Sequence, residues 1–203
     1  MDELRLTQEE QTILGAVRDH FPDLSMEIGK ACGQLSIIVD KKMIVPVCKV
    51  LKEHPATLFD YLADLCGVDF LGKREKRFQV VYNLYSIQRN HRLRIKVDID
   101  EADGHVDSVT GIWKTANWHE RELYDMVGIE GRGHPDLKRI LMPDDWEGYP
   151  LRKDYPLQGK GQRDDFSFVP KDDRQPTRKP KDRAESWRSR LLKKNLHRTR
   201  SKV

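Results

Sequence analysis

The densest group of side chains able to do chemistry lies in residues 117–128, with the sequence NWHERELYDMVG. The polar residues at its start suit a helix N-cap and Gly128 suits a left-handed C-cap, so we predict about ten residues of helix between them. On that helix Arg121, Glu122 and Asp125 share one face, because they lie three and four residues apart. Such a group could perform acid–base chemistry. We favour a structural ion cluster, an arginine held between two anions, because no nucleophile, second histidine or phosphate-binding loop accompanies it.

Metal and nucleotide sites can be tested on the same stretch of chain. His119 begins like a zinc-protease helix, but that motif needs a second histidine one turn later, where this chain has Leu123. The spacing of the cysteines fits neither a metal knuckle nor an even-numbered disulfide framework; they are Cys32, Cys48 and Cys66. We therefore expect no catalytic residue, no metal ligand and no cofactor-binding residue in this chain. If it did carry an active site of its own, the candidates would be Glu122, Asp125 and His134.

The first element that helps to position this helix is another helix, which a capping box at Thr7 predicts near the start of the chain. Two apolar runs at residues 34–40 and 42–47 predict a pair of strands. The second strand is expected at a sheet edge, because it contains a proline that cannot donate to a ladder. A second helix is predicted over residues 55–66, with Gly67 as its C-cap.

The middle of the chain then changes to a period of two. Residues 78–86 carry apolar side chains at alternate positions along one face, and residues 92–100 alternate apolar with polar side chains. This pattern predicts two strands, of which the second has one buried and one solvated face. Asp103-Gly104 signals a hairpin turn, and residues 106–113 supply a returning strand. The order α-β-β-α-β-β-β-α, with short turns, predicts an α+β fold: a two-layer domain over residues 1–142, with a mainly antiparallel sheet and helices packed on it.

The composition changes after this domain. Residues 143–158 interleave prolines and aromatic residues with charges, and we predict an extended wrapping segment moulded against another protein, against the chain's own sheet, or both. Residues 159–203 form a basic extended tail, with a pattern compatible with a short helix at 183–196. The tail carries a net charge of +9 and residues 1–158 carry −5, within a total of +4. This asymmetry suggests a charged partner.

The chain shows no sign of a membrane-spanning or secretory segment. Its longest apolar runs, such as residues 35–39 and 43–48, fall far short of the ~20 residues that cross a bilayer. The N-terminus is acidic and lacks the apolar core of a signal peptide. We expect a soluble protein that stays in the cytoplasm.

Three stretches then become recognisable: ERELYDMVGI at 120–129, GHPDLKRIL at 133–141 and DWEGYPLRKDYPL at 145–157. In order and spacing they closely resemble the signature of the 30-kDa subunit of proton-translocating NADH-quinone oxidoreductase, respiratory complex I. One departure is Glu130-Gly131-Arg132, where the family usually has an aromatic residue. The residues assigned to the signature and to a partner interface are Glu120, Arg121, Glu122, Asp125, Gly128, His134, Pro135, Leu137, Arg139, Asp145, Trp146, Pro150, Leu151, Arg152, Lys153, Asp154, Tyr155 and Pro156.

The resemblance implies a non-catalytic scaffold subunit in the peripheral, quinone-reducing arm of a respiratory-chain translocase. In that complex electrons pass from NADH through FMN and Fe-S clusters to quinone, coupled to proton translocation, while this subunit binds no cofactor itself. The implied partners are the 49-kDa subunit and neighbouring Fe-S subunits. The implied location is peripheral, on the cytoplasmic face of the cell inner membrane, with contact to the membrane only through the complex.

Other interpretations stay open at this point. Related subunits occur in ferredoxin- or F420-dependent quinone oxidoreductases and in membrane-bound hydrogenases, and nothing in the sequence names the electron donor. A more remote alternative is a basic-tailed nucleic-acid-binding module, which the acidic body and the single tryptophan of the tail disfavour. Within a complex we expect the tail to dock on an acidic neighbouring protein; lipid headgroups and plain solvent are the alternatives.

Overall fold

The computed structural model describes residues 5–157 and residue 159. The predicted basic tail and its helix at 183–196 lie outside the described residues, apart from Gly159. The domain boundaries after residues 142 and 158 therefore stay predictions. No helix in the described part of the chain is long and apolar enough to cross a bilayer.

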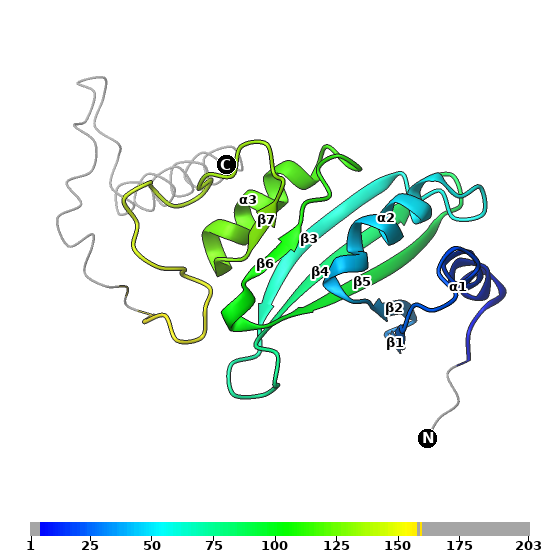
Figure 1. The fold of residues 1–203 in the computed structure, drawn as a ribbon, viewed down its shortest axis with the longest axis horizontal. Coiled ribbons are helices and arrows are strands. Elements are labelled where there is room, and N and C mark those ends of the chain that lie inside the picture. The colour runs from blue at the N-terminus through cyan, green and yellow to red at the C-terminus, as the bar shows by residue number, and fades with distance from the viewer. Residues whose placement is uncertain (1–4, 158, 160–203) are drawn as a thin grey trace, which may run out of the picture. The chain divides into compact units, whose positions relative to one another are not determined.

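A five-stranded sheet is the centre of the fold, with the strand order β1-β2-β5-β4-β3 (Figure 1). Its strands are β1 (Glu27–Ala31), β2 (Gln34–Ile38), β3 (Tyr61–Asp69), β4 (Phe78–Ser86) and β5 (His91–Ile99). All neighbouring strands run antiparallel except β2 and β5, which are parallel. The prediction of a mainly antiparallel sheet is confirmed.

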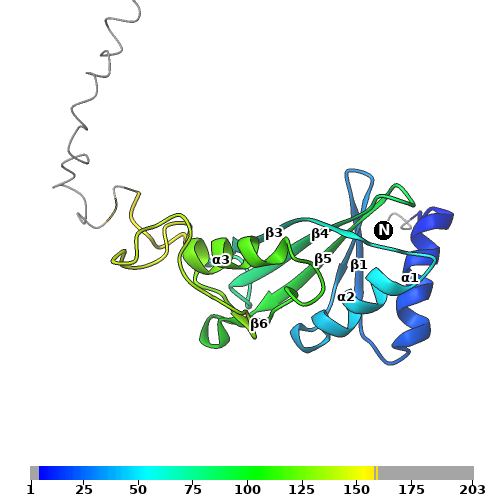
Figure 2. The same cartoon turned by 90° about the horizontal axis from the view of Figure 1, so that it is seen from above.

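Three helices accompany the sheet: α1 (Gln8–His20), α2 (Ile44–Glu53) and α3 (Ala116–Val127). Short 3-10 turns precede α2 at η1 (Lys41–Met43) and follow β5 at η2 (Glu101–Asp103). A second, two-stranded parallel sheet joins β6 (His105–Asp107) to β7 (Glu130–Arg132), which flank α3 in the sequence. Figure 2 shows the same elements from above. The α+β fold class is confirmed.

The predicted capping box of α1 is present in full. The Thr7 hydroxyl accepts a hydrogen bond from the Glu10 backbone N–H at 3.3 Å, and the Glu10 carboxylate accepts one from the Thr7 N–H at 2.7 Å. Two otherwise unpaired N–H groups at the helix start are thereby satisfied. The local sequence alone was sufficient here, because both partners lie within one turn.

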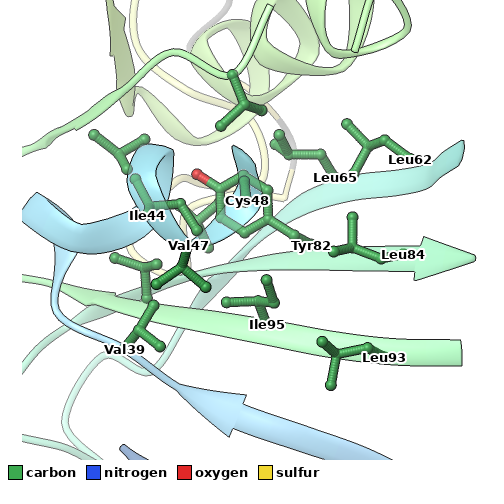
Figure 3. Close-up of a cluster of buried hydrophobic side chains, with 14 of the residues drawn as sticks. Val39, Ile44, Val47, Cys48, Leu62, Leu65, Tyr82, Leu84, Leu93 and Ile95 are labelled. Atoms are coloured by element: carbon green, nitrogen blue, oxygen red, sulfur yellow. The ribbon is translucent and has the colours of Figure 1, made fainter. Parts of the chain in front are cut away.

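The core lies between the sheet and the helices. Alternate side chains of β5 are buried, as the period of two predicts, whereas β4 buries both of its faces from Phe78 to Tyr82. The apolar side chains of the two strands on the core face are Phe78, Val80, Tyr82, Leu84, Leu93, Ile95, Val97 and Ile99. Figure 3 shows Ile44, Val47 and Cys48 of α2 gathered over this face of the sheet, with Tyr82 among them. Leu65 of β3 pairs with Tyr82, so β3 contributes to the same buried face.

The predicted strand at residues 42–47 is wrong, because this run lies in η1 and the start of α2. Ile44, Val47, Cys48 and Leu51 are all buried along one helical stripe. Pro46 is compatible with this because, in the first turn, its missing N–H would have had no partner within the helix. A short apolar run fits either period, and the packing of α2 on the sheet decides between them.

The predicted helix at residues 55–66 is also wrong, since this stretch is a turn followed by β3. The pairing of β3 with β4 shifts register between Leu62 and Asp64. This irregularity makes Leu62 and Leu65 the buried apolar residues of the strand, so their spacing of three imitates a helix. Gly67 is not a C-cap: it lies inside β3, at the place where α3 packs on the sheet.

The returning strand predicted at 106–113 shrinks to the three residues of β6, which pairs with β7 and not with β5. The following residues form a tight turn in which the Trp113 N–H donates to the Val109 carbonyl at 3.0 Å. The side chains of Val109 and Trp113 are both buried, which explains why the apolar run resembled a strand. Asp103-Gly104 does not form a hairpin turn, because Asp103 ends η2. Strand β1 was not predicted at all.

Candidate functional site

Helix α3 lies closely on β3 because β3 has a glycine beneath it. A Cβ at Gly67 would stand 2.6 Å from Cδ1 of Leu123 and 3.1 Å from Cγ2 of Val127. A larger residue would fit only if the Leu123 and Val127 side chains, or the helix, moved. Trp113, just before α3, is buried and donates its indole N–H to the Phe59 carbonyl at 3.0 Å. The sheet therefore holds α3 at its start and along its length.

The predicted C-cap of α3 is confirmed at Gly128, which has a left-handed φ of 80° and donates its N–H to the carbonyls of Leu123 and Tyr124. The Tyr149 ring lies directly over this glycine, so a Cβ there would be 2.5 Å from the ring. Backbone conformation and close contact both require glycine. The start of α3 differs from the prediction: its N-cap is Thr115, without a side-chain cap.

The Asp125 carboxylate accepts four hydrogen bonds. Its side chain is fully buried, and Oδ2 accepts hydrogen bonds from three successive backbone N–H groups of the chain after β7, at 3.0, 2.7 and 2.8 Å; the donors are Ile140, Leu141 and Met142. Oδ1 accepts one from Nη1 of Arg139 at 2.7 Å. Burial raises the pKa of Asp125, but the bonds from Met142, Arg139 and the other donors outweigh it, so the pKa lies below its ordinary value. Asp125 thus holds the loop at 139–142 against α3.

The ion cluster predicted within α3 has a different composition. The cation beside Asp125 is Arg139 and not Arg121. Arg121 donates to two backbone carbonyls, from Nε to Lys138 at 3.0 Å and from Nη2 to Arg139 at 2.8 Å, while Glu122 is exposed. The prediction that Arg121 is held between Glu122 and Asp125 is therefore wrong. The face binds backbone and an arginine from a distant segment, which helical spacing cannot reveal.

The wrapping segment is fastened to the end of α3 by arginines. Arg139 also donates Nη2 to the carbonyls of Trp146 at 2.8 Å and Gly148 at 3.2 Å. Arg152 donates Nε to the Val127 carbonyl at 2.6 Å. Carbonyls at a helix C-terminus lack partners within the helix, so an arginine there satisfies an exposed acceptor and the negative end of the helix dipole.

Aromatic rings fill the space between these arginines. The Arg152 guanidinium lies 4.5 Å from the centre of the Tyr149 ring and 5.0 Å from that of Phe78 in β4. Arg139 lies 5.7 Å from the Tyr149 ring, and Tyr124 meets that ring edge-on. The wrapping segment therefore packs on its own domain, as the sequence allowed. Whether it also contacts another protein stays a prediction.

A second attachment, at the end of β3, was not predicted. Asp69 and Arg77 form a buried bidentate pair, with Nε to Oδ1 at 3.1 Å and Nη2 to Oδ2 at 2.9 Å. Arg77 also binds Asp154 of the wrapping segment at 2.7 Å, and the Lys153 N–H donates to Asp69 at 2.8 Å. Burial opposes the ionised form, but Arg77 and the backbone donors lower the pKa of Asp69 to about 2. The sequence could not predict this pair, because charged residues at strand ends are common and most of them are solvated.

Glu120 is buried on the opposite side of α3. Its Oε1 accepts a hydrogen bond from the Val109 N–H at 2.8 Å, and its Oε2 lies 2.8 Å from where a Cβ of Gly131 would stand. Burial raises its pKa, against the opposing effects of the Ser108 hydroxyl and the Val109 N–H. Glu120 therefore joins α3 to the turn after β6 and packs against Gly131 of β7. A side chain at position 131 would meet this carboxylate, so the close approach favours glycine there.

His134 has a structural role in the loop after β7. Its Nε2 lies 3.0 Å from the Asn117 carbonyl, and its Nδ1 lies 3.0 Å from the Asp136 N–H. A neutral ring protonated on Nε2 satisfies both contacts. Its ring nitrogens are thus engaged by backbone, and Asp125 by four donors, so neither is available as the acid or base considered above. Among the described residues no group of three or more His, Cys, Asp or Glu could hold a metal ion.

The other predicted site residues lie in the loop after β7 and in the wrapping segment. Trp146 and Tyr155 are half-buried and stack on each other with ring centres 6.3 Å apart. The remaining positions divide into half-buried Leu137 and Pro150 and exposed Pro135, Asp145, Leu151, Lys153 and Pro156. The structure thus gathers Gly128, Asp125, Arg139 and Arg152 around the end of α3.

Comparison with known proteins identifies the family to which a chain with this fold and these signature residues belongs. The chain is a member of the family described as the 30-kDa subunit of respiratory-chain NADH dehydrogenase, whose model matches residues 37–161. It is 50% identical over 143 residues to the C subunit of NADH-quinone oxidoreductase from Geotalea uraniireducens (strain Rf4), covering 70% of this chain and 85% of the relative. It is 46% identical over 143 residues to the protein of the same name from Geobacter sulfurreducens, covering 70% and 87%. The resemblance drawn from the signature is confirmed.

Solved structures agree with the fold. A structure described as Nqo5, a trypsin-resistant fragment, matches with a TM-score of 0.53 at 30% identity, covering 64% of this chain and all of that fragment. A chain from the membrane-bound sulfane sulfur reductase, an archaeal respiratory membrane complex, matches with a TM-score of 0.62 at 19% identity, covering 81% and 95%. The second match supports the fold alone.

Proposed function

We propose that this chain is a non-catalytic scaffold subunit in the peripheral arm of an NADH-quinone oxidoreductase. The observation that supports this most directly is how the signature residues are used: Asp125, Arg139 and Arg152 hold neighbouring segments of the chain to one another. Groups bound in this way stabilise a surface, and they are not free to react. The complex would pass electrons from NADH through FMN and Fe-S clusters to quinone, coupled to proton translocation, with no cofactor bound by this chain.

The partners follow from the same proposal. The main neighbour would be the 49-kDa subunit, with Fe-S subunits adjacent, on the cytoplasmic face of the inner membrane. The chain would touch the membrane only through its complex. The matches to subunits of respiratory enzymes that contain several chains support such a hetero-oligomer.

The test is deletion of the gene and complementation with a tagged copy. We expect deletion to abolish NADH-quinone reductase activity of membranes, and the tagged copy to restore it and to co-purify with the other subunits. The purified chain alone should turn over neither NADH nor quinone. Turnover by the isolated chain, or unchanged membrane activity after deletion, would contradict the scaffold role.

A related complex with another electron donor is the second candidate, because nothing in the sequence names the donor. The names of the more similar relatives favour NADH. Offering the purified complex NADH, reduced ferredoxin or reduced F420 separates the two candidates, because only one donor should support quinone reduction at an appreciable rate.

A further inference from the structure

A groove on the domain surface brings together two leucines that are distant in sequence. Leu71 follows β3 and Leu151 belongs to the wrapping segment, and both line one hollow with Val68. Leu71 is 42% exposed and Leu151 is 59% exposed. Large apolar side chains that meet on a surface commonly mark a binding site, whereas single exposed ones do not.

The walls of this groove are held in place by one buried carboxylate. Oδ1 of Asp69 accepts a hydrogen bond from the Leu71 N–H at 2.9 Å, and Oδ2 accepts one from the Lys153 N–H at 2.8 Å. The Leu151 N–H donates to the Met126 carbonyl at the end of α3, at 2.9 Å. Both leucines are therefore presented on fixed backbone. A preformed site of this kind loses little conformational entropy when a partner binds.

The rim of the groove is basic. Lys73 and Lys153 both line it and are exposed. Among the residues that the structure describes, neither ammonium group forms a salt bridge. Two cations beside an apolar floor are complementary to a peptide with an apolar side chain flanked by carboxylates.

We propose that this groove, lined by Leu71, Lys73, Leu151 and Lys153, binds an acidic segment with an apolar anchor from another protein of the complex. The proposal rests on the hetero-oligomer proposed above. Charge argues against the two other occupants. The chain's own tail carries +9 and would be repelled by the lysines. A second copy related by a two-fold axis would bring lysines against lysines.

The test compares groove variants with matched variants elsewhere, in the tagged full-length chain purified with its complex. The groove variants are Leu71→Ser with Leu151→Ser, and Lys73→Glu with Lys153→Glu. The apolar control is Ile87→Ser, because Ile87 is 64% exposed after β4. The charge control is Lys114→Glu, at an exposed lysine before α3.

We expect each groove pair to weaken retention of a partner protein about tenfold or more, the effect of losing central interface contacts. If the lysines contribute, high salt should release the partner from the wild-type chain more readily than low salt does. The two control variants should retain their partners as the wild-type chain does. The isolated groove variants should melt at the wild-type temperature, which excludes misfolding. Retention of all partners by both groove pairs, at low and high salt, would overturn the proposal.

Two measurements separate the other occupants. Light scattering that finds the isolated wild-type chain dimeric and the leucine variant monomeric would overturn the proposal in favour of a second copy. Thiol labelling of Leu71→Cys that becomes faster when the chain is truncated after Leu157 would overturn it in favour of the tail. A wild-type chain that co-purifies with no other protein of the complex would refute the proposed function itself, a result distinct from failure of the groove variants alone.

Discussion

Replacing Asp125 by alanine removes the acceptor of three backbone N–H groups and the partner of Arg139 at a fully buried position. Breaking a buried ion pair from one side costs about 3–5 kcal/mol, because the other partner stays buried without a counter-charge. Water that enters the site can satisfy some of the N–H groups. We therefore expect the free energy of unfolding to fall by about 3–5 kcal/mol, a large share of the ~5–15 kcal/mol typical of a domain.

The assay is urea denaturation of the isolated chain, followed by circular dichroism. Glu122→Ala is the matched control, because Glu122 is an exposed carboxylate on the same helix, and its loss should change stability by no more than about 0.5 kcal/mol. Asp125→Asn keeps the shape but not the charge, so it should lie between the two. If Asp125→Ala loses less than about 1 kcal/mol and matches the control, the buried bonds are not what holds the loop to α3.

The pH dependence of stability gives the same prediction a second readout. The folded-state pKa of Asp125 is lowered, so its contribution is present above the unfolded-state pKa of about 3.9 and is lost as pH falls through the lower folded-state value. Asp125→Asn should lack this part of the acid sensitivity. An equal loss of stability on acidification in both proteins would refute the assigned charge state.

Three further changes test the supports of α3. Gly128→Ala should destabilise the chain by more than about 1 kcal/mol in the same denaturation assay, because φ is +80° and the Tyr149 ring fills the space. Gly111→Ala is the control and should be nearly neutral, because no atom lies within 4 Å of its Cβ. Gly67→Ala should cost about 1–3 kcal/mol, since its Cβ would press against the Leu123 and Val127 side chains. Near-wild-type stability would show that these side chains or the helix adjust freely. Asp69 has a folded-state pKa of about 2, so about 2–3 kcal/mol should be lost as pH falls from about 5 to about 1. This loss should be missing in Asp69→Asn, and its persistence there would assign the acid sensitivity elsewhere.

The wrapping segment shows how a chain poor in apolar residues can still order an extended stretch. Hydrophobic residues make up 37% of the sequence and charged residues 34%. Residues 143–157 contain no helix or strand, yet Arg152 and the backbone of Leu151 join them to α3, and Asp154 joins them to Arg77, just before β4. A regular element would bury an apolar layer against the domain. Here arginine bonds to helix-end carbonyls and the buried Asp69–Arg77 ion pair take the place of that layer.

Local patterns account for what could be predicted. The α1 capping box, the strands at 78–86 and 92–100 and the Gly128 cap each depend on residues within a few positions, and each is confirmed. The strand at 42–47 and the helix at 55–66 are wrong, because short apolar runs fit both periods and the β3 register shift disguises a strand. The ion cluster within α3 is wrong because helical spacing shows which residues share a face and not what lies opposite.

The sequence by itself determined the family, since the signature from Glu120 to Leu157 can be read without any coordinates, and it determined the α+β class through the periods of its elements. Only the tertiary structure decided the pairings that give the signature its meaning: Asp125 with Arg139, Arg152 with the end of α3, and Asp69 with Arg77 and Asp154. The physical reason is that a charge can pair with many residues of opposite sign. Burial and distance select one of them, and both are set by how the helices pack on the sheet.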